Sequence, residues 1–118
     1  MFDPLEFLRV AYELKDISNE AEIRTSIGRA YYATFLFARE WLRAKGWPIY
    51  DDYSDHGEVI KGLKNYKGKT ASDKMYDLHK NFRKIADYEL RGRSINEVDA
   101  DDAYKLANDI ITKIRSGP

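Results

Sequence analysis

The chain has 118 residues, of which 43% are hydrophobic and 14% aromatic, and it contains no cysteine. A chain of this length buries enough surface to fold around one core, and its aromatic content is too high for a disordered protein. The lack of cysteine excludes disulfides, thiolate zinc sites and cysteine nucleophiles. We therefore expect residues 1–118 to form a single domain.

Twenty basic and twenty acidic side chains cancel, so the whole molecule has no net field that would attract nucleic acid or a membrane surface. Residues 61–93 nevertheless hold ten Lys or Arg and four Asp or Glu. A solvated lysine-rich face is the ordinary explanation, and a phosphate-contacting face is the alternative. The start of the chain lacks the features of a signal peptide, and no apolar run approaches the ~18 residues of a membrane span. We expect a cytoplasmic protein without a membrane partner.

The first half of the chain predicts two helices. Asp3 followed by Pro4 is typical of a helix start, and apolar residues then recur at helical spacing to about residue 17. Ser18 or Asn19 caps a second helix, which ends at Gly46. This second helix would be about 40 Å long, because each helical residue adds about 1.5 Å, and it should be the central helix of a bundle.

Residues 47–57 lack a helical period and predict the one substantial loop. Three further helices are expected at about residues 58–66, 71–90 and 98–115, with a connector at residues 91–99. No segment alternates with period two as a strand would. The fold class is therefore all-α, an antiparallel up-and-down bundle of about five helices with one long central helix.

Two residues of the second helix do not suit a plain core. Arg24 and Gly28 lie in or beside its apolar stripe, and we expect Gly28 to allow the close approach of a helix or a second subunit. Arg24 either reaches solvent or pairs with an acid. On the fourth predicted helix, His79, Arg83 and Asp87 follow one another at steps of four and form one ridge. We predict that Asp87 pairs with Arg24 or Arg29, with a solvated ridge as the alternative.

Motifs for metal and nucleophilic chemistry are missing. The two histidines, His56 and His79, lie in different elements, and a zinc site would need them to be joined by carboxylates such as Asp52 and Asp55. No nucleophile elbow, phosphate-binding lysine loop or dinucleotide fingerprint occurs. We expect no bound metal and no cofactor.

The sequence resembles the HEPN family of small helical bundles. The matching segments are RTSIGRAYYATFLFARE at residues 24–40, HGEVI at 56–60 and FRKIADYE at 82–89, before a final amphipathic helix. This resemblance implies a homodimer that often pairs with a small nucleotidyltransferase in toxin–antitoxin systems, and in many members a ribonuclease. The catalytic signature of those ribonucleases is an arginine followed four to six residues later by histidine.

Arg83 matches that arginine, but the residues four to six further on are Asp87, Tyr88 and Glu89. A carboxylate in the place of the histidine repels phosphate and has no proton to give near neutral pH. We therefore expect a non-catalytic module that binds a nucleotidyltransferase or a nucleotide. The alternative is a divergent ribonuclease acting on RNA, and a purely structural oligomer subunit is a third hypothesis.

The residues that we expect to take part fall into two sets. The binding or polar-network set is Arg24, Arg29, Tyr32, His56, His79, Arg83, Asp87 and Tyr88. The catalytic set of the ribonuclease alternative is Arg83, Asp87, Tyr88 and His56.

Large rings point in several directions from the second helix and predict the dimer. Tyr32, Phe37 and Trp41 lie well away from Tyr31 and Phe35 around the helix, so one core should not cover all five. A second subunit would cover the remainder.

Overall fold

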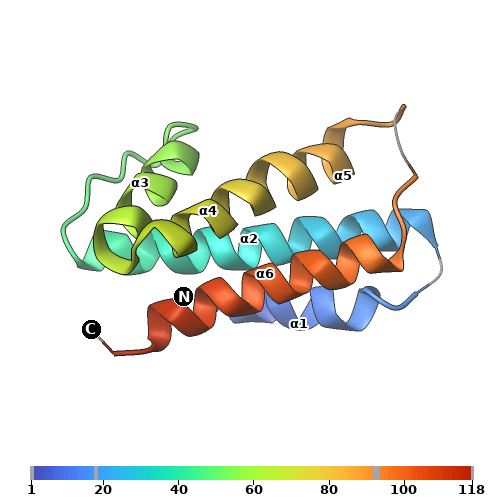
Figure 1. Cartoon of the computed structure of the whole chain (residues 1–118), viewed down its shortest axis with the longest axis horizontal. Helices are drawn as coiled ribbons and strands as arrows, with labels where there is room; N and C mark the ends of the chain where they lie inside the picture. The colour runs from blue at the N-terminus through green and yellow to red at the C-terminus, as the bar shows by residue number, and fades with distance from the viewer. Residues whose placement is uncertain (1, 18, 92–93, 118) are drawn as a thin grey trace.

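The computed structural model describes residues 2–17, 19–91 and 94–117. Their elements are α1 (Leu5–Leu14), α2 (Glu20–Ala44), α3 (Asp55–Lys67), α4 (Lys69–Asp77), the π-helical segment η1 (Leu78–Arg83), α5 (Lys84–Tyr88) and α6 (Glu97–Arg115). The segments α4, η1 and α5 follow without a break and form one rod, so the described residues make five helical rods and no strand (Figure 1). The predicted all-α bundle is confirmed.

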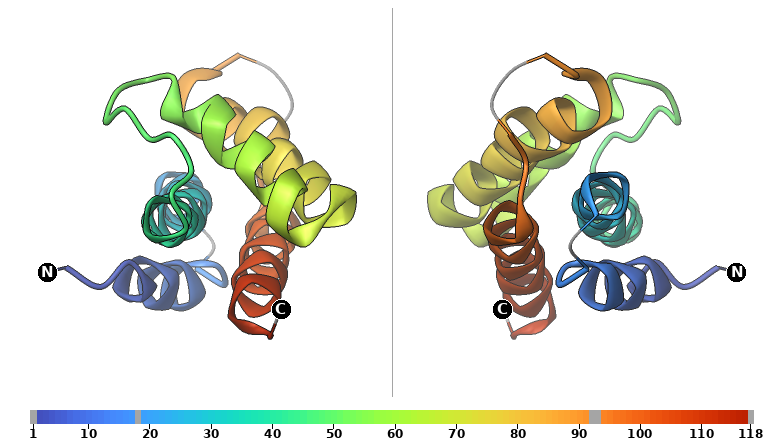
Figure 2. Two further views of the ribbon diagram at one scale, coloured as in Figure 1. Left: turned by 90° about the vertical axis from the view of Figure 1, so that its left-hand side faces the viewer. Right: turned by 90° about the vertical axis from the view of Figure 1, so that its right-hand side faces the viewer.

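The long helix α2 is the centre of the bundle. It packs against α1, α3, η1, α5 and α6. The rods α1 and α4–η1–α5 run in one direction along the molecule, and α2 and α6 run in the other (Figure 1). Seen end-on, α1, α2, α6 and the α4–η1–α5 rod surround one core (Figure 2). At 25 residues, α2 spans most of the 41 Å length of the molecule, as its sequence predicts.

Local capping explains where most helices begin. The Asp3 carboxylate accepts the amide of Leu5 at 3.0 Å, which starts α1 around Pro4. The Asn19 side chain accepts the amides of Ala21 and Glu22 and starts α2. A reciprocal capping box starts α6, in which Asn96 and Asp99 each accept a backbone amide of the other.

Several boundaries differ from the sequence prediction. Helix α3 begins at Asp55, three residues earlier than predicted. The buried Asp55 carboxylate accepts the amides of Tyr50 and Asp51 at 2.9 Å and so holds the preceding loop against the start of the helix. Only Gly68, with a φ of 97°, separates α3 from α4, so α4 also begins earlier than expected. Helix α1 ends at Leu14 instead of near residue 17, and α5 ends at Tyr88.

The described core is built from the inward faces of the rods, and its largest side chains with almost no exposure include Tyr31, Ile27, Leu42, Leu63 and Met75. No described helix has the length and apolar character required to cross a bilayer.

Candidate functional site

Six side chains from α2, α3 and the α4–η1–α5 rod form one polar and aromatic cluster. We call it the Arg83 cluster, and its members are Tyr31, Tyr32, His56, His79, Arg83 and Tyr88. The paired tyrosines come from the middle of α2, His56 from the first turn of α3, and the other three from η1 and the end of α5. Residues far apart in the sequence are therefore brought together only by helix packing.

Arg83 is at the centre of the cluster and is only 6% exposed. Its Nη2 donates to the hydroxyl of Tyr32 at 2.8 Å and to that of Tyr88 at 3.2 Å. Its guanidinium carbon lies 5.1–5.5 Å from the ring centres of Tyr31, Tyr32 and Tyr88, within cation–π range. Burial alone would lower the pKa of Arg83, but the tyrosine contacts raise it by more, so the guanidinium stays charged.

The two histidines stack on each other next to this arginine. The ring centres of His56 and His79 are 5.0 Å apart with planes only 11° from parallel, and both rings also stack on Tyr31. Burial lowers the pKa of His56, and the positive charge of Arg83 lowers it further. Burial also lowers the pKa of His79 to about 4, with His56 and nearby cations acting in the same direction. Both imidazoles are therefore neutral near pH 7.

The buried hydroxyl of Tyr31 is bonded to His56. Burial raises the pKa of Tyr31 well above its ordinary value, so this phenol keeps its proton. Its hydroxyl is hydrogen-bonded to Nδ1 of His56. A phenol that keeps its proton can donate to Nδ1 or accept from it, so the tautomer of the neutral imidazole decides the direction of this bond.

The π-helical segment explains why His79 and Arg83 both point inward. Residues 78–83 form η1, which is wider than an α-helix and shifts the positions of the side chains around the axis. As a result Leu78, His79 and Arg83 are all buried. The sequence pattern placed His79 and Arg83 on a ridge beside the apolar face, because it assumed an unbroken α-helix.

Hydrogen-bonding capacity in the cluster is incompletely used. Among the described residues, the buried side-chain nitrogen and oxygen atoms without a hydrogen-bond partner are Nδ1 of His79 and Nε of Arg83. Arg83 Nε lies 3.3 Å from an Asp87 carboxylate oxygen, an ion pair by distance but without hydrogen-bond geometry. Unpaired buried polar atoms are uncommon in folded proteins and call for a physical reason.

The prediction that Asp87 pairs with Arg24 or Arg29 is wrong. Arg24 does join α2 to α5, but its Nη1 donates to the backbone carbonyls of Ile85, Ala86 and Glu89 at 2.9–3.1 Å. These carbonyls lie at the end of α5, and a cation binds well there because it is the negative end of the helix dipole. The Arg29 guanidinium lies over the Phe7 ring of α1, at 4.7 Å, and 5.9 Å from the centre of the Tyr32 ring.

Asp87 lies at the edge of the cluster, with about a third of its side chain exposed. It pairs with Arg83 four residues earlier, as the ridge spacing allows. Gly28 faces it directly: a Cβ atom at Gly28 would lie 3.2 Å from an Asp87 carboxylate oxygen. The expected close approach at Gly28 is thus confirmed as a contact between helices, and it explains why the helix carries glycine there.

Five of the predicted residues meet in the cluster: Tyr32, His56, His79, Arg83 and Tyr88. Arg24 lies outside it, and Arg29 contacts only the ring of Tyr32. Tyr31 is not among the predicted site residues; it is fully buried, yet its hydroxyl reaches His56. The doubled tyrosine of the RAYYA segment was the available signal for this second role. The described residues contain no group of three or more metal-ligating side chains, and Asp55 closes the loop before α3 instead of facing both histidines.

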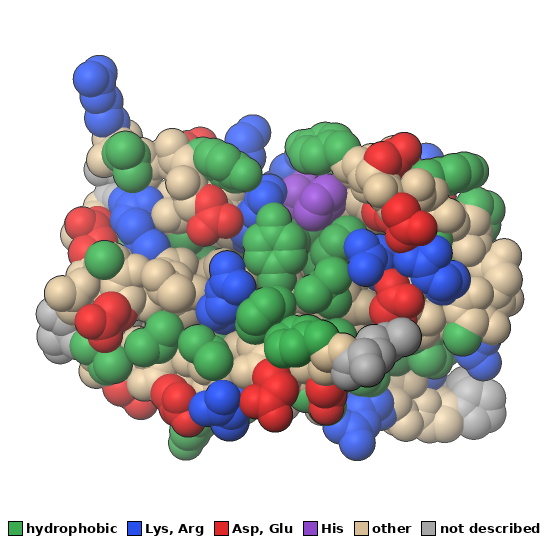
Figure 3. All heavy atoms as spheres, turned by 180° about the vertical axis from the view of Figure 1, so that it is seen from behind, with side chains coloured by type: hydrophobic (Ala, Val, Ile, Leu, Met, Phe, Trp, Pro, Cys, Tyr) green, Lys and Arg blue, Asp and Glu red, His purple; other side chains and the backbone are tan. Residues whose placement is uncertain are grey.

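The surroundings of the cluster are basic and aromatic. Burial lowers the pKa values of both histidines most; Lys80, Lys84 and Arg39 act in the same direction, and Asp55 opposes them at His56. Tyr53 is 77% exposed, and its ring lies 5.2 Å from that of His56. On the face drawn in Figure 3, a histidine reaches the surface between hydrophobic and basic side chains.

Comparison with known proteins gives one relative. An uncharacterized protein of Methanocaldococcus jannaschii, MJ0628, is 37% identical over 79 residues. The match covers 64% of this chain and 37% of the archaeal protein, so the chain matches little more than a third of that protein's length. The chain matches no family model. It matches no solved structure.

Proposed function

We propose that this chain is a non-catalytic binding module of the HEPN type that binds the phosphate of a nucleotide at the Arg83 cluster. As part of the same proposal, the module forms a homodimer and pairs with a small nucleotidyltransferase in a toxin–antitoxin-like system. The observation that carries the binding site is the buried, charged Arg83, whose own Nε lacks a hydrogen-bond partner, as does Nδ1 of His79. A phosphate that displaces the Asp87 carboxylate would accept from Arg83 Nε and would be stabilised by the charge.

The surroundings of Arg83 match the chemistry of a nucleotide. The positive potential from Lys80 and Lys84 favours a phosphate, and the exposed rings of Tyr53 and Tyr88 offer flat surfaces for a base. Because the tyrosine hydroxyls already hold the arginine in place, the site would need little reordering on binding.

Titration of the purified protein with AMP and ATP, followed by calorimetry, tests the site. We expect binding that falls at least tenfold in Arg83→Met, which keeps an unbranched side chain but removes the charge. Arg9→Met is the matched control, because Arg9 is exposed on α1 and pairs there with Glu6 and Glu13, outside the cluster. Equal affinity in Arg83→Met and the wild type would contradict the proposal.

The dimer is tested separately by light scattering. Along α2, Tyr32 and Phe37 are only partly buried in the single chain, which leaves apolar surface for a second copy to cover. We expect a dimer at high micromolar concentration, and a monomer there would refute this part. The nucleotidyltransferase is tested by co-purification with the product of a neighbouring gene of that class.

A divergent ribonuclease is the second candidate, and one observation favours it. The structure brings His56 and His79 together, and His79 and Arg83 pack on the same Tyr31 ring, although no motif predicted that the two histidines would meet. RNA cleavage without a metal needs a proton acceptor, a proton donor and a cation for the phosphate. Two neutral imidazoles and Arg83 supply an acceptor and a cation but no acid near pH 7.

The two candidates differ in one assay. Purified protein is incubated with total RNA in chelator, beside the variants Arg83→Ala and His56→Ala. We expect no cleavage above background. Cleavage by the wild type that disappears in both variants would contradict the binding-module proposal and favour the ribonuclease.

A further inference from the structure

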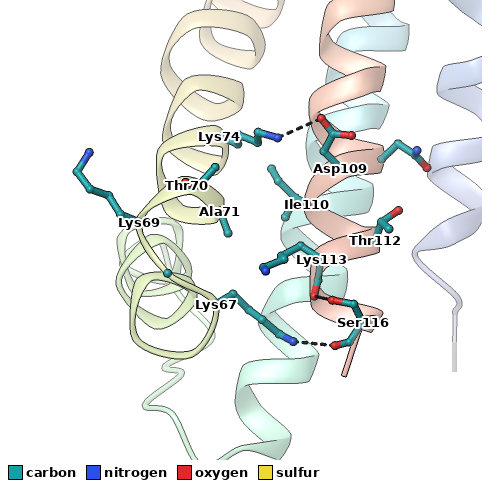
Figure 4. A pocket seen from close by; sticks show the side chains of 12 residues that line it. Lys67, Lys69, Thr70, Ala71, Lys74, Asp109, Ile110, Thr112, Lys113 and Ser116 are labelled. Carbon is teal, nitrogen blue, oxygen red and sulfur yellow. Dashed lines mark hydrogen bonds and ion pairs between the residues drawn. The ribbon is translucent and has the colours of Figure 1, made fainter. Parts of the chain in front are cut away.

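A groove of about 660 Å³ lies between α4 and the end of α6 and shares no residue with the Arg83 cluster. We call it the lysine groove; Lys67, Lys74 and Lys113 border it, and Ala71 and Ile110 form its apolar floor. Figure 4 shows Lys67 and Lys113 extending into the space between the helices, whereas Lys69, also on the rim, points away. Its volume is in the range of pockets that hold small organic ligands.

The charge of the groove is only partly balanced. Lys74 pairs with Asp109 at 3.2 Å. Lys67 donates to the backbone carbonyl of Ser116 at 2.9 Å. Neither Lys67 nor Lys113 has a carboxylate partner among the described residues. A groove with unpaired cations attracts a ligand with more than one negative charge.

An aromatic pocket of about 310 Å³ adjoins the groove, and Lys67 and Ser116 line both. Its rings are those of Trp41 and Tyr66, which meet edge to face at 5.5 Å. The ammonium groups of Lys45 and Lys67 lie over the Trp41 ring, at 5.3 and 5.4 Å. Lys67 thus connects the cationic groove to a partly exposed indole.

We propose that the lysine groove and this pocket together bind a short stretch of single-stranded nucleic acid. Its phosphates contact Lys67, Lys74 and Lys113, and one base stacks on Trp41 in place of a lysine. A basic channel beside an aromatic platform is the arrangement by which proteins hold single strands without reading their sequence. Basic residues at helix ends also complement helix dipoles, but that effect does not account for a tryptophan beside them.

The first test measures the anisotropy of a fluorescein-labelled ten-nucleotide oligo(U). Each phosphate contact with a single strand contributes about 0.7 to the slope of log K against log salt. Lys67→Gln/Lys113→Gln should therefore lower the slope by about 1.4 and the affinity about 20-fold at 0.1 M salt. Lys61→Gln/Lys64→Gln is the control: it removes the same charge from exposed positions of α3 outside the groove.

The second test reads the base contact directly. The chain has two tryptophans, so Trp47→Phe leaves Trp41 as the single indole. We expect its emission to be quenched by the oligonucleotide and not by inorganic phosphate, and quenching by AMP to need at least a tenfold higher concentration. Three results would overturn the proposal: an equal loss of affinity in both lysine pairs, unchanged Trp41 emission at saturation with the strand, or quenching of Trp41 by AMP at the same concentration as by the strand. Circular dichroism establishes that each variant is folded.

Discussion

Lowering the pH from 7 to 5 should destabilise this protein through His79. The pKa of His79 is about 4 in the folded chain, because its ring is buried against His56 and near several cations, and about 6.5 in the unfolded chain. As the pH falls, the unfolded chain binds a proton first, so unfolding becomes more favourable. The contribution of the neutral ring is fully present above pH 6.5 and is lost between pH 6.5 and 4.

The two pKa values set the size of the effect. At pH 5 nearly all of the unfolded chain carries a proton on His79, whereas about a tenth of the folded chain does. The free energy of unfolding should therefore fall by about 2 kcal/mol between pH 7 and 5. His56 adds to this fall, since its pKa is also lowered. The carboxyl groups whose pKa is lowered, such as those of Glu40 and Asp101, titrate below the interval from pH 7 to 5.

Urea unfolding at pH 7 and pH 5 measures this difference. The variant His79→Phe keeps a flat ring in the stack but cannot bind a proton, so it should lose most of the pH dependence whatever its stability at pH 7. Proton NMR titration gives the pKa directly, and we expect the His79 signal to move below pH 5. A wild-type stability that changes by less than about 0.5 kcal/mol between the two pH values, or a His79 pKa near 6.5, would refute the reasoning.

Three further predictions concern stability in urea. Gly62→Ala should destabilise the protein by about 1 kcal/mol or more, because the new Cβ atom would lie 2.7 Å from the fully buried side chain of Leu42. Gly57→Ala, in the same helix, is the control: its Cβ atom would meet nothing within 4 Å, so this variant should be slightly more stable. Equal midpoints for the two would be inconsistent with that packing. Arg24→Leu removes three bonds to α5 carbonyls and should cost about 2 kcal/mol, with greater protease sensitivity near residue 90; a wild-type midpoint would show that water replaces the arginine. Asp87→Ala should cost only about 1 kcal/mol, since a third of its side chain is exposed and Arg83 keeps its tyrosine bonds; a loss above about 3 kcal/mol would mean that the ion pair dominates.

The amino-acid sequence determined the all-α fold, the long central helix and most helix starts. These features depend on interactions between residues a few positions apart, such as the Asn19 cap of α2 and the Asn96 box of α6. The need for a glycine at residue 28 was also visible, because a glycine on a buried helix face has a cost that only a close neighbour explains.

Only the tertiary structure decided which polar residues meet. His56 and His79 are 23 positions apart and stack because α3 and η1 both pack on Tyr31 of α2. The π-helical segment changes the direction of Arg83, and a periodicity of 3.6 residues cannot anticipate that change. The partner of Arg24 was a set of backbone carbonyls, which side-chain patterns do not reveal. Contacts between distant elements depend on how the helices are rotated and packed, and local sequence carries little information about either.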